Sequence, residues 1–418
     1  MPAAAPIGSF QEKPVILAIF AITYLGIAVG RIPGLKLNRV GIALLGAIGM
    51  MIFAGISTST VVSSVNWPTI FLLFGFFVIS AQLRLSGFYD QVAGGISARL
   101  GHPAKFMLVL ILVAGGLSAV LNNDIVAFVF APIVGSALLR QRINPVPYLI
   151  ALAVATNIGA AATLIGNAQG MMIGQIAHLS FAKYLAWAIV PVTVSLATAF
   201  GIIWLMSGKS LGSALPLPSE TESETYPFNL AHTIKGLVIL AVVVGMLFTS
   251  LPKEIIALAA AAIHLASPKF RTEDLLKLVD WPILVLFMSL FVVTGAFQST
   301  GYGDQAAQWL AHSGVNLNSP PALALVTAAL SNIIGNSGTV MLLLKLVDLS
   351  HPVNAYTLAV ANSFGGNLLL IGSVANIIVI QQARTLGIKI SFGDFAKLGI
   401  PVTLAALAAL LSWVLIVG

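Results

Sequence analysis

The chain has 418 residues, of which 58% are hydrophobic and only 8% are charged. So little charge over such a length excludes a soluble globular protein and indicates a polytopic membrane protein. The absence of cysteine excludes disulfides, iron–sulfur clusters and thiolate metal sites. The net charge of +7 is explained better by basic loops between membrane spans than by nucleic-acid binding.

The first half of the chain, residues 1–206, predicts five membrane crossings and one hairpin. The first three spans are 14–30, 40–56 and 68–83, and the last is 184–206. Two apolar arms at 104–121 and 125–139 are each shorter than the roughly 20 residues that a crossing needs, so we expect a re-entrant hairpin over 104–139. The segment 146–178 is expected to be one crossing made of two half-helices, broken at 157–167.

The second half, residues 229–418, repeats this order after a mobile cytoplasmic linker at 207–228. Its segments are 230–249, 254–266, 282–297, a hairpin at 320–347, a broken helix at 353–382, and 392–417. Short helices at 87–100 and 301–312 are expected to lie along the membrane interface. Because each half has an odd number of crossings, the two repeats must have inverted topology. The predicted fold is therefore all-α, with about ten transmembrane spans.

The basic residues support this topology. All of the 20 Lys and Arg residues fall on one side of the predicted membrane, except Lys13, Lys183, Lys253 and Lys345. The positive-inside rule makes the richer side cytoplasmic, so both termini are expected outside the cytoplasm of a multi-pass inner-membrane protein.

Three short polar motifs occur once in each half. The first half has Asn66-Trp67-Pro68, Leu121-Asn122-Asn123-Asp124 and Leu164-Ile165-Gly166-Asn167. The second half has Asp280-Trp281-Pro282, Ile334-Gly335-Asn336-Ser337 and Leu370-Ile371-Gly372-Ser373. Paired polar breaks in two hydrophobic repeats are the best sequence indication of a transporter's binding site.

The order of hairpins and broken helices resembles the ion transporter superfamily, which includes divalent anion–sodium symporters and NhaD-type antiporters. Within it, the segment from Gly366 to Ala375 and the pair Asn123-Asp124 are similar to motifs of ArsB-type arsenite permeases. Two departures stand out: Leu370 replaces the family's proline, and Gly335-Asn336-Ser337 replaces its paired asparagines. This resemblance implies arsenite efflux. It also implies a homodimer and an accessory ATPase as alternatives to a chain acting alone.

The hairpin tips and helix breaks supply the predicted substrate site. Helix ends expose unpaired amides and carbonyls, Asn side chains both donate and accept, and glycines allow close backbone approach. The predicted substrate-binding residues are Asn122, Asn123, Asn157, Thr163, Gly166, Asn167, Gly335, Asn336, Ser337, Thr339, Asn367, Gly372 and Ser373. We expect the substrate to lie between Asn123 and Asn336. A plainer role, binding freed backbone groups, is open for Asn157 and Asn367 and is favoured for Asn332.

Asp124 is the predicted site of proton or cation coupling. It is the only acid at either tip or in either helix break. An intramembrane carboxylate is costly and is functional by default, and in apolar surroundings it holds a proton more readily than in water. The alternative is that Asp124 caps the second arm of the hairpin.

These features predict a secondary transporter without enzymatic activity, metal or cofactor, embedded in membrane lipid. Because the tips and breaks contain no Arg or Lys, a neutral metalloid hydroxide fits them better than a carboxylate, and proton-coupled efflux of arsenite or antimonite is the leading hypothesis. The alternatives are a carboxylate or inorganic oxyanion carrier driven by Na+ or H+, and a Na+/H+ antiporter.

Overall fold

The computed structural model describes residues 12–29, 37–97, 102–208, 226–267 and 269–417. The helices of the first half are α1 (Glu12–Val29), α2 (Arg39–Phe53), α3 (Thr58–Ser64), α4 (Trp67–Leu85), α5 (Phe88–Ser97), α6 (Pro103–Val120), α7 (Asn123–Arg140), α8 (Val146–Ala160), α9 (Ala168–Ile176) and α10 (Phe181–Ser207). No strand occurs within these ranges.

The second half contains the same succession of helices. They are α11 (Leu230–Met246), α12 (Lys253–Leu265), α13 (Thr272–Lys277), α14 (Trp281–Ser299), α15 (Tyr302–His312), α16 (Pro320–Ile333), α17 (Gly335–Leu343), α18 (Pro352–Gly365), a 3-10 turn (Leu370–Gly372), α19 (Val374–Thr385) and α20 (Phe392–Val417). The helix ends are equivalent in detail. Asn66 caps α4 and Asp280 caps α14, and each following tryptophan donates its indole N–H to the carbonyl oxygen five residues earlier.

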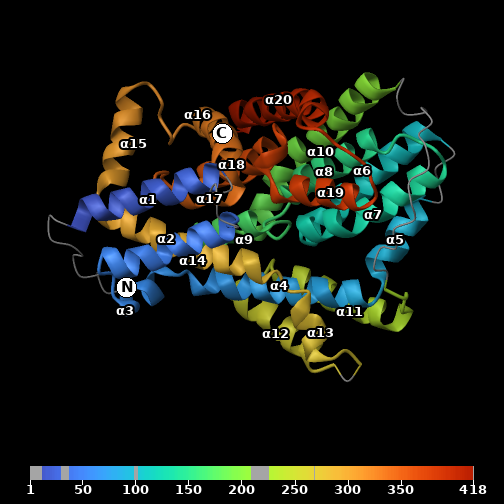
Figure 1. Cartoon of the computed structure of the whole chain (residues 1–418), viewed down its shortest axis with the longest axis horizontal. Coiled ribbons are helices and arrows are strands. Elements are labelled where there is room, and N and C mark those ends of the chain that lie inside the picture. The colour runs from blue at the N-terminus through green and yellow to red at the C-terminus, as the bar shows by residue number, and fades with distance from the viewer. Residues whose placement is uncertain (1–11, 30–36, 98–101, 209–225, 268, 418) are drawn as a thin grey trace.

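The two short connecting helices α5 and α15 lie at opposite ends of the bundle, with their axes across it (Figure 1). Each follows a glycine with positive φ, Gly87 at 71° and Gly301 at 78°, which turns the chain sharply out of α4 or α14. This placement is the one expected of two repeats that face opposite sides of a membrane.

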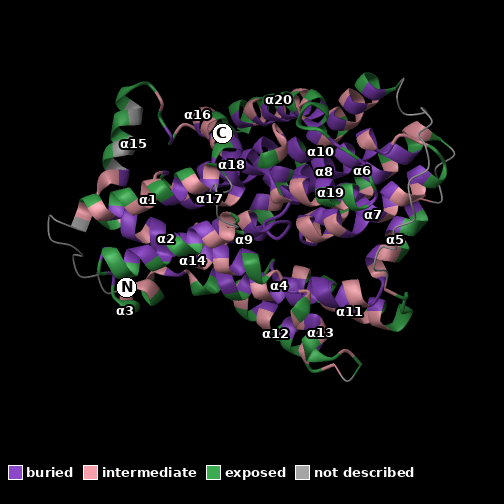
Figure 2. Cartoon of the chain, in the orientation of Figure 1, coloured by how far each residue is buried: buried purple, intermediate pink, exposed green. Residues whose placement is uncertain are grey.

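The broken helices form the centre of the molecule. Every residue of α8 after Val146 is buried, and so is every residue of α18 from Asn354 to Gly365. Figure 2 shows this buried region around α8, α18 and α9, with the exposed residues toward the periphery. A helix that is buried all round has no exposed polar face, so α8 and α18 show no amphipathic pattern and their few polar side chains are buried.

The halves also pack against each other at the periphery. Helix α2 packs on α14, α12 packs on α4, and α10 packs on α20. A Cβ added to Gly75 in α4 would lie 2.6 Å from the Ala257 backbone of α12. The close approach of these two helices therefore depends on that glycine, as is common between membrane helices.

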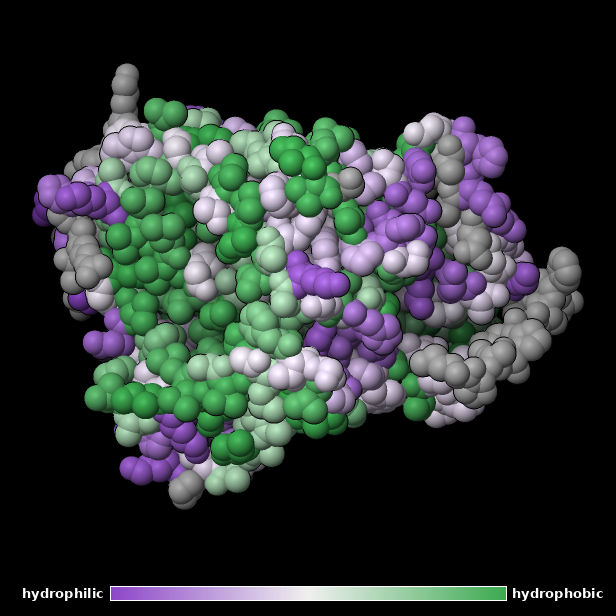
Figure 3. Space-filling model, turned by 180° about the vertical axis from the view of Figure 1, so that it is seen from behind, coloured by the Kyte–Doolittle hydropathy of each residue, from purple (hydrophilic) through white to green (hydrophobic). Residues whose placement is uncertain are grey.

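The chain is an all-helical polytopic membrane protein. Six described helices are long and apolar enough to cross a bilayer, and five further apolar helices are shorter. Figure 3 shows a broad area of hydrophobic side chains on one face of the molecule, with hydrophilic side chains gathered toward one end. Exposed Ile234, Val238 and Val242 on α11 and exposed Ile189 and Val194 on α10 are typical of a lipid-facing surface.

The helices agree with the predicted segments, with four differences. The arms of the first predicted hairpin, α6 and α7, have 18 residues each and are among the six helices long enough to cross a bilayer, so the expectation that they are too short to cross was wrong and their re-entrant course stays a prediction. The break in the first broken helix begins after Ala160 rather than at Asn157, because helical hydrogen bonding tolerates a buried Asn whose side chain finds partners elsewhere. The short helices α3 and α13 were not predicted. Part of the predicted linker, residues 209–225, lies outside the described residues, and the repeat boundaries and the cytoplasmic position of the linker stay predictions.

Candidate functional site

The tip of the first hairpin, between α6 and α7, is held by Asn122 and Asn123. Asn122 is the N-cap of α7, and its Oδ1 accepts from the Asp124 amide at 2.8 Å. The Asn123 amide donates to the Gly166 carbonyl at 3.1 Å, which fixes the tip to the break between α8 and α9. The capping role considered for Asp124 is therefore wrong, because Asn122 already performs it.

The Asp124 carboxylate has no hydrogen-bond or ion-pair partner among the described residues. It is half-buried in the first turn of α7. Asp280, the N-cap of α14, is an acid whose charge acts on Asp124, and its own Oδ1 accepts from the Ile283 amide at 3.1 Å. A carboxylate in this position can take up a proton or a cation without first giving up a protein partner.

Asn157 lies at the centre of a polar network that joins the two repeats. Its Nδ2 donates to Asn367 (2.8 Å) and Asn376 (2.9 Å), while its Oδ1 accepts from Asn123 (3.1 Å) and Ser373 (2.9 Å). These four bonds use the full hydrogen-bonding capacity of the amide. Asn157 thus connects the first hairpin tip to the break of the second repeat and leaves no group free for a solute in this conformation.

Two further bonds cross between the repeats. Asn167 donates to Ser363 of α18 at 2.9 Å, and Gln169 of α9 donates to Ser337 at the second tip at 2.8 Å. Thr163 donates its hydroxyl to the Ala119 carbonyl and so ties the first break to α6. The first break therefore contacts both the first hairpin and the second.

The second tip, between α16 and α17, is built on Gly335. Its φ of 74° suits glycine alone, and α17 begins there without a side-chain cap, so its first amides are available to an anion. In the amide orientation that satisfies its side chain, Asn336 donates to the carbonyls of Gly372 (3.0 Å) and Asn362 (3.3 Å). Thr339 is fully buried one turn further on.

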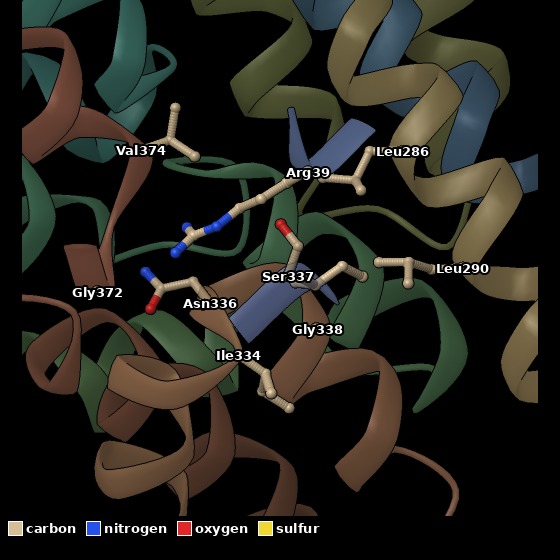
Figure 4. Close-up of a pocket in the computed structure, with 11 residues that line it drawn as sticks. Arg39, Leu286, Leu290, Ile334, Asn336, Ser337, Gly338, Gly372 and Val374 are labelled. Atoms are coloured by element: carbon tan, nitrogen blue, oxygen red, sulfur yellow. The ribbon is translucent and has the colours of Figure 1, made fainter. Parts of the chain in front are cut away.

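Arg39, the first residue of α2, reaches this tip. Its Nη1 and Nη2 donate to the Ile371 carbonyl at 3.3 and 3.2 Å, and a Cβ at Gly335 would lie 3.0 Å from Nη1. Figure 4 shows the guanidinium beside Asn336, with the Ser337 side chain on the other side of the same pocket. The pocket has an empty volume of about 340 Å³ including open solvent and is also lined by Ile27, Leu286, Leu290, Ile334, Gly338, Gly372 and Val374.

The predicted residues other than Thr339 divide between two places, and Thr339 is in neither. Gly335, Asn336, Ser337 and Gly372 line the pocket with Arg39. Asn122, Asn123, Asn157, Thr163, Gly166, Asn167, Asn367 and Ser373 form the polar network around the first tip and the two breaks. Asn332 binds the Ala328 and Gly365 carbonyls, which confirms the backbone-binding role expected of it.

Comparison with known proteins identifies the family. A family described as "CitMHS: Citrate transporter" matches residues 16–360. The chain belongs to the CitMHS family. This assignment agrees with the resemblance to the ion transporter superfamily, and the narrower resemblance to arsenite permeases stays a prediction.

The similar proteins of this CitMHS chain are membrane transporters and not enzymes. It is 29% identical over 420 residues to the "Uncharacterized transporter Rv2685" of Mycobacterium tuberculosis, covering 94% of this chain and 96% of that one. It is 26% identical over 447 residues to the "Silicon efflux transporter LSI3" of Oryza sativa subsp. japonica, covering 90% and 92%. The solved YdaH transporter of Alcanivorax borkumensis shares the fold, with a TM-score of 0.58 at 14% identity, covering 97% of both chains.

The predicted set of site residues does not include Arg39, Gln169, Ser363 or Asn376. Arg39 lies between the predicted spans 14–30 and 40–56 and was therefore counted with the cytoplasmic loop residues, but its half-buried side chain turns inward to the second tip. The internal repeat of the sequence contains a feature that could have indicated Arg39. The spacing set by Asn66-Trp67-Pro68 and Asp280-Trp281-Pro282 places Arg39 at the position equivalent to Lys253, and both residues are basic.

Proposed function

We propose that this CitMHS member carries a small carboxylate across the membrane, using H+ or Na+ as the coupling ion. The observation that supports it is the Arg39 guanidinium in the pocket at the second hairpin tip. The arsenite hypothesis had rested on the lack of a cation at the tips and breaks, and Arg39 supplies one. A guanidinium, the uncapped amides of α17 and the side chains of Asn336 and Ser337 together form a donor set that fits a carboxylate.

The binding is expected to be weak enough for release. In this conformation both Nη1 and Nη2 of Arg39 donate hydrogen bonds to one backbone carbonyl oxygen, that of Ile371, at N···O distances of more than 3 Å. A substrate carboxylate can replace this carbonyl as the acceptor. Because the carboxylate is charged, its hydrogen bonds with the guanidinium are shorter and stronger than those to the carbonyl. Exchange between a carbonyl and a substrate oxygen needs only a small movement of the Arg39 side chain.

Coupling is assigned to Asp124. Its carboxylate is free of protein partners among the described residues, and it lies on the first tip, whereas Arg39 lines the pocket at the second. An intramembrane carboxylate is a functional group by default, and H+ and Na+ are the two ions that it could exchange. The proposal includes an inner-membrane location with both termini outside the cytoplasm; a homodimer and an accessory ATPase stay predictions from the resemblance.

Neutral metalloid hydroxides are the second candidate substrate class. The relative named as a silicon efflux transporter, 26% identical to this chain, supports keeping this class in the test. Arsenite and antimonite efflux belongs to it. A neutral hydroxide would bind the Asn and Ser groups and would not need Arg39.

The test is uptake by purified protein in proteoliposomes, with citrate, succinate, arsenite and 22Na+ measured in parallel under imposed pH and Na+ gradients. We expect gradient-driven accumulation of a carboxylate. Accumulation of arsenite or 22Na+ without any carboxylate uptake would overturn the proposal and favour the metalloid or antiporter alternative.

A further inference from the structure

The position of Arg39 has an exact equivalent in the second repeat. A constant spacing relates Trp67 to Trp281, Leu72 to Leu286 and Arg39 to Lys253. Arg39 is the first residue of α2, and Lys253 is the first residue of α12. Each side chain is half-buried, and each donates to a backbone carbonyl near the broken helix of the other repeat: Arg39 to Ile371 and Lys253 to Leu179.

The pockets around the two cations are also equivalent. Leu286 and the second tip line the pocket of Arg39, while Leu72, Leu164 and Ile165 line a smaller pocket with Lys253. The difference lies in the tips. The Arg39 pocket includes Gly335 to Gly338, but the Lys253 pocket includes no residue of the first tip and is lined instead by residues of α9.

The two repeats are therefore in unequal conformations. Arg39 contacts the break and tip of the second repeat, whereas Lys253 contacts Leu179, beyond the far end of α9. In transporters with inverted repeats, alternating access is a movement of one repeat against the other around a fixed site, and the internal symmetry allows this movement to exchange the conformations of the two repeats. By that exchange, Lys253 comes to the first tip as Arg39 leaves the second.

Charge favours the same movement. The first tip contains the Asp124 carboxylate, which forms no ion pair with a basic residue among the described residues. Glu254, the chain neighbour of Lys253, attracts it in this conformation but forms no ion pair with it, and the Glu254 carboxylate accepts from Gln175 at 2.9 Å. A lysine that reaches the first tip would gain a direct ion-pair partner in Asp124.

We propose that Lys253 pairs with Asp124 in the opposite-facing conformation, where it occupies at the first tip the place that Arg39 occupies here at the second. This inference deepens the proposed function, because it assigns Lys253 to the coupling site of the same carrier. It makes Lys253 a positioning residue for Asp124 and not a ligand of the substrate in the described conformation.

Disulfide crosslinking tests this directly, because the natural chain has no cysteine. Asp124→Cys with Lys253→Cys reports the proposed contact, and Arg39→Cys with Ser337→Cys reports its counterpart. Both pairs are oxidised in membrane vesicles: the first, which keeps Arg39, under opposite citrate gradients, and the second, which keeps Asp124, under opposite pH or Na+ gradients. We expect the first pair to crosslink only under gradients that favour one facing conformation and the second pair only under gradients that favour the other.

The proposal is overturned if Asp124→Cys and Lys253→Cys form no crosslink under any condition. It is also overturned if this crosslink forms equally whether or not the Arg39→Cys and Ser337→Cys crosslink forms. Crosslinking reports positions and not transport, so failure of carboxylate transport would leave this result interpretable. As a second measurement, Lys253→Gln should slow transport roughly tenfold at unchanged KM, because a conformational step is affected. Lys253→Arg and the exposed Lys183→Gln should transport normally, and a normal rate in Lys253→Gln would also contradict the proposal.

Discussion

Ser373 donates a 2.9 Å hydrogen bond to Asn157, and Asn167 donates a 2.9 Å hydrogen bond to Ser363. In the first bond serine is the donor and asparagine the acceptor, and in the second the two residue types are reversed. The repeat spacing that relates Gly166 to Gly372 relates Asn157 to Ser363 and Asn167 to Ser373. The two bonds are therefore equivalent under the internal symmetry. Each joins the end of one break to the buried helix of the other repeat, so the broken helices are held as one unit.

The Asn157 network predicts a loss of stability on truncation. Asn157→Ala removes four hydrogen bonds and leaves Asn123, Ser373, Asn367 and Asn376 without that partner. A buried polar group that loses its partner costs about 1–3 kcal/mol, so we expect a clear fall in the melting temperature of the detergent-solubilised protein. Asn38→Ala, which removes one exposed helix cap, should cost at most about 1 kcal/mol. A larger effect at Asn38 than at Asn157 would contradict this account.

The contact between α6 and α8 predicts that Gly159 is irreplaceable. A Cβ at Gly159 would lie 2.2–2.5 Å from the backbone of Gly115, and backbone atoms cannot move aside as a flexible side chain can. We expect Gly159→Ala to abolish folding or transport. Gly116 is the matched control, because a Cβ there meets no atom within 4 Å, and Gly116→Ala should be neutral or slightly stabilising in its helix. Size-exclusion profiles of the two variants make the comparison.

A comparison of Gly335→Ala with Gly301→Ala distinguishes the effect of backbone strain from the effect of displacing Arg39. Gly335→Ala meets both a positive φ and a guanidinium nitrogen at 3.0 Å, whereas Gly301→Ala meets a positive φ of 78° with no atom within 4 Å. Each should cost about 1 kcal/mol in backbone strain. Only Gly335→Ala should raise the KM for the carboxylate, because only there must Arg39 move. Equal KM values in the two variants would show that the pocket does not depend on the position of Arg39.

Substitution of Asp124 is expected to abolish ion coupling. Asp124→Asn keeps the size of the side chain and leaves the cap by Asn122 in place, but it removes the only charge on either tip. We expect downhill exchange of substrate to continue while gradient-driven accumulation stops. The measurement is counterflow beside uptake under a pH or Na+ gradient. Normal accumulation by Asp124→Asn would assign coupling to another group, with nearby Asp280 the first to test.

The sequence predicted the helices well and the site only in part. Hydropathy and the repeated motifs located the helix pairs α6–α7 and α16–α17 and the interruptions between α8 and α9 and between α18 and α19, because breaks in long apolar segments are local features. That the helix pairs are re-entrant hairpins stays a prediction. The polar interruptions in both halves of the sequence predicted that their side chains would lie close together in the fold. The sequence could not predict which of them meet, since the bond between Asn157 and Asn367 joins residues 210 positions apart.

Arg39 and Lys253 show the limit most clearly. Each stands at the boundary between a polar segment and an apolar one, where a basic residue is usually a solvated loop residue. Their inward direction depends on the packing of α2 against α14 and of α12 against α4, which is a tertiary property. The hypothesis of a neutral substrate followed from leaving Arg39 out of the site.

The central claim is that Arg39 binds a carboxylate at the second hairpin tip. The most direct measurement is the equilibrium affinity of the purified protein for citrate in the natural chain, Arg39→Lys and Arg39→Gln, with the exposed Arg384→Gln as control. The account predicts that Arg39→Gln weakens binding roughly 10- to 100-fold, with Arg39→Lys between it and the natural chain, and that Arg384→Gln has no effect. Unchanged citrate affinity in Arg39→Gln would contradict it.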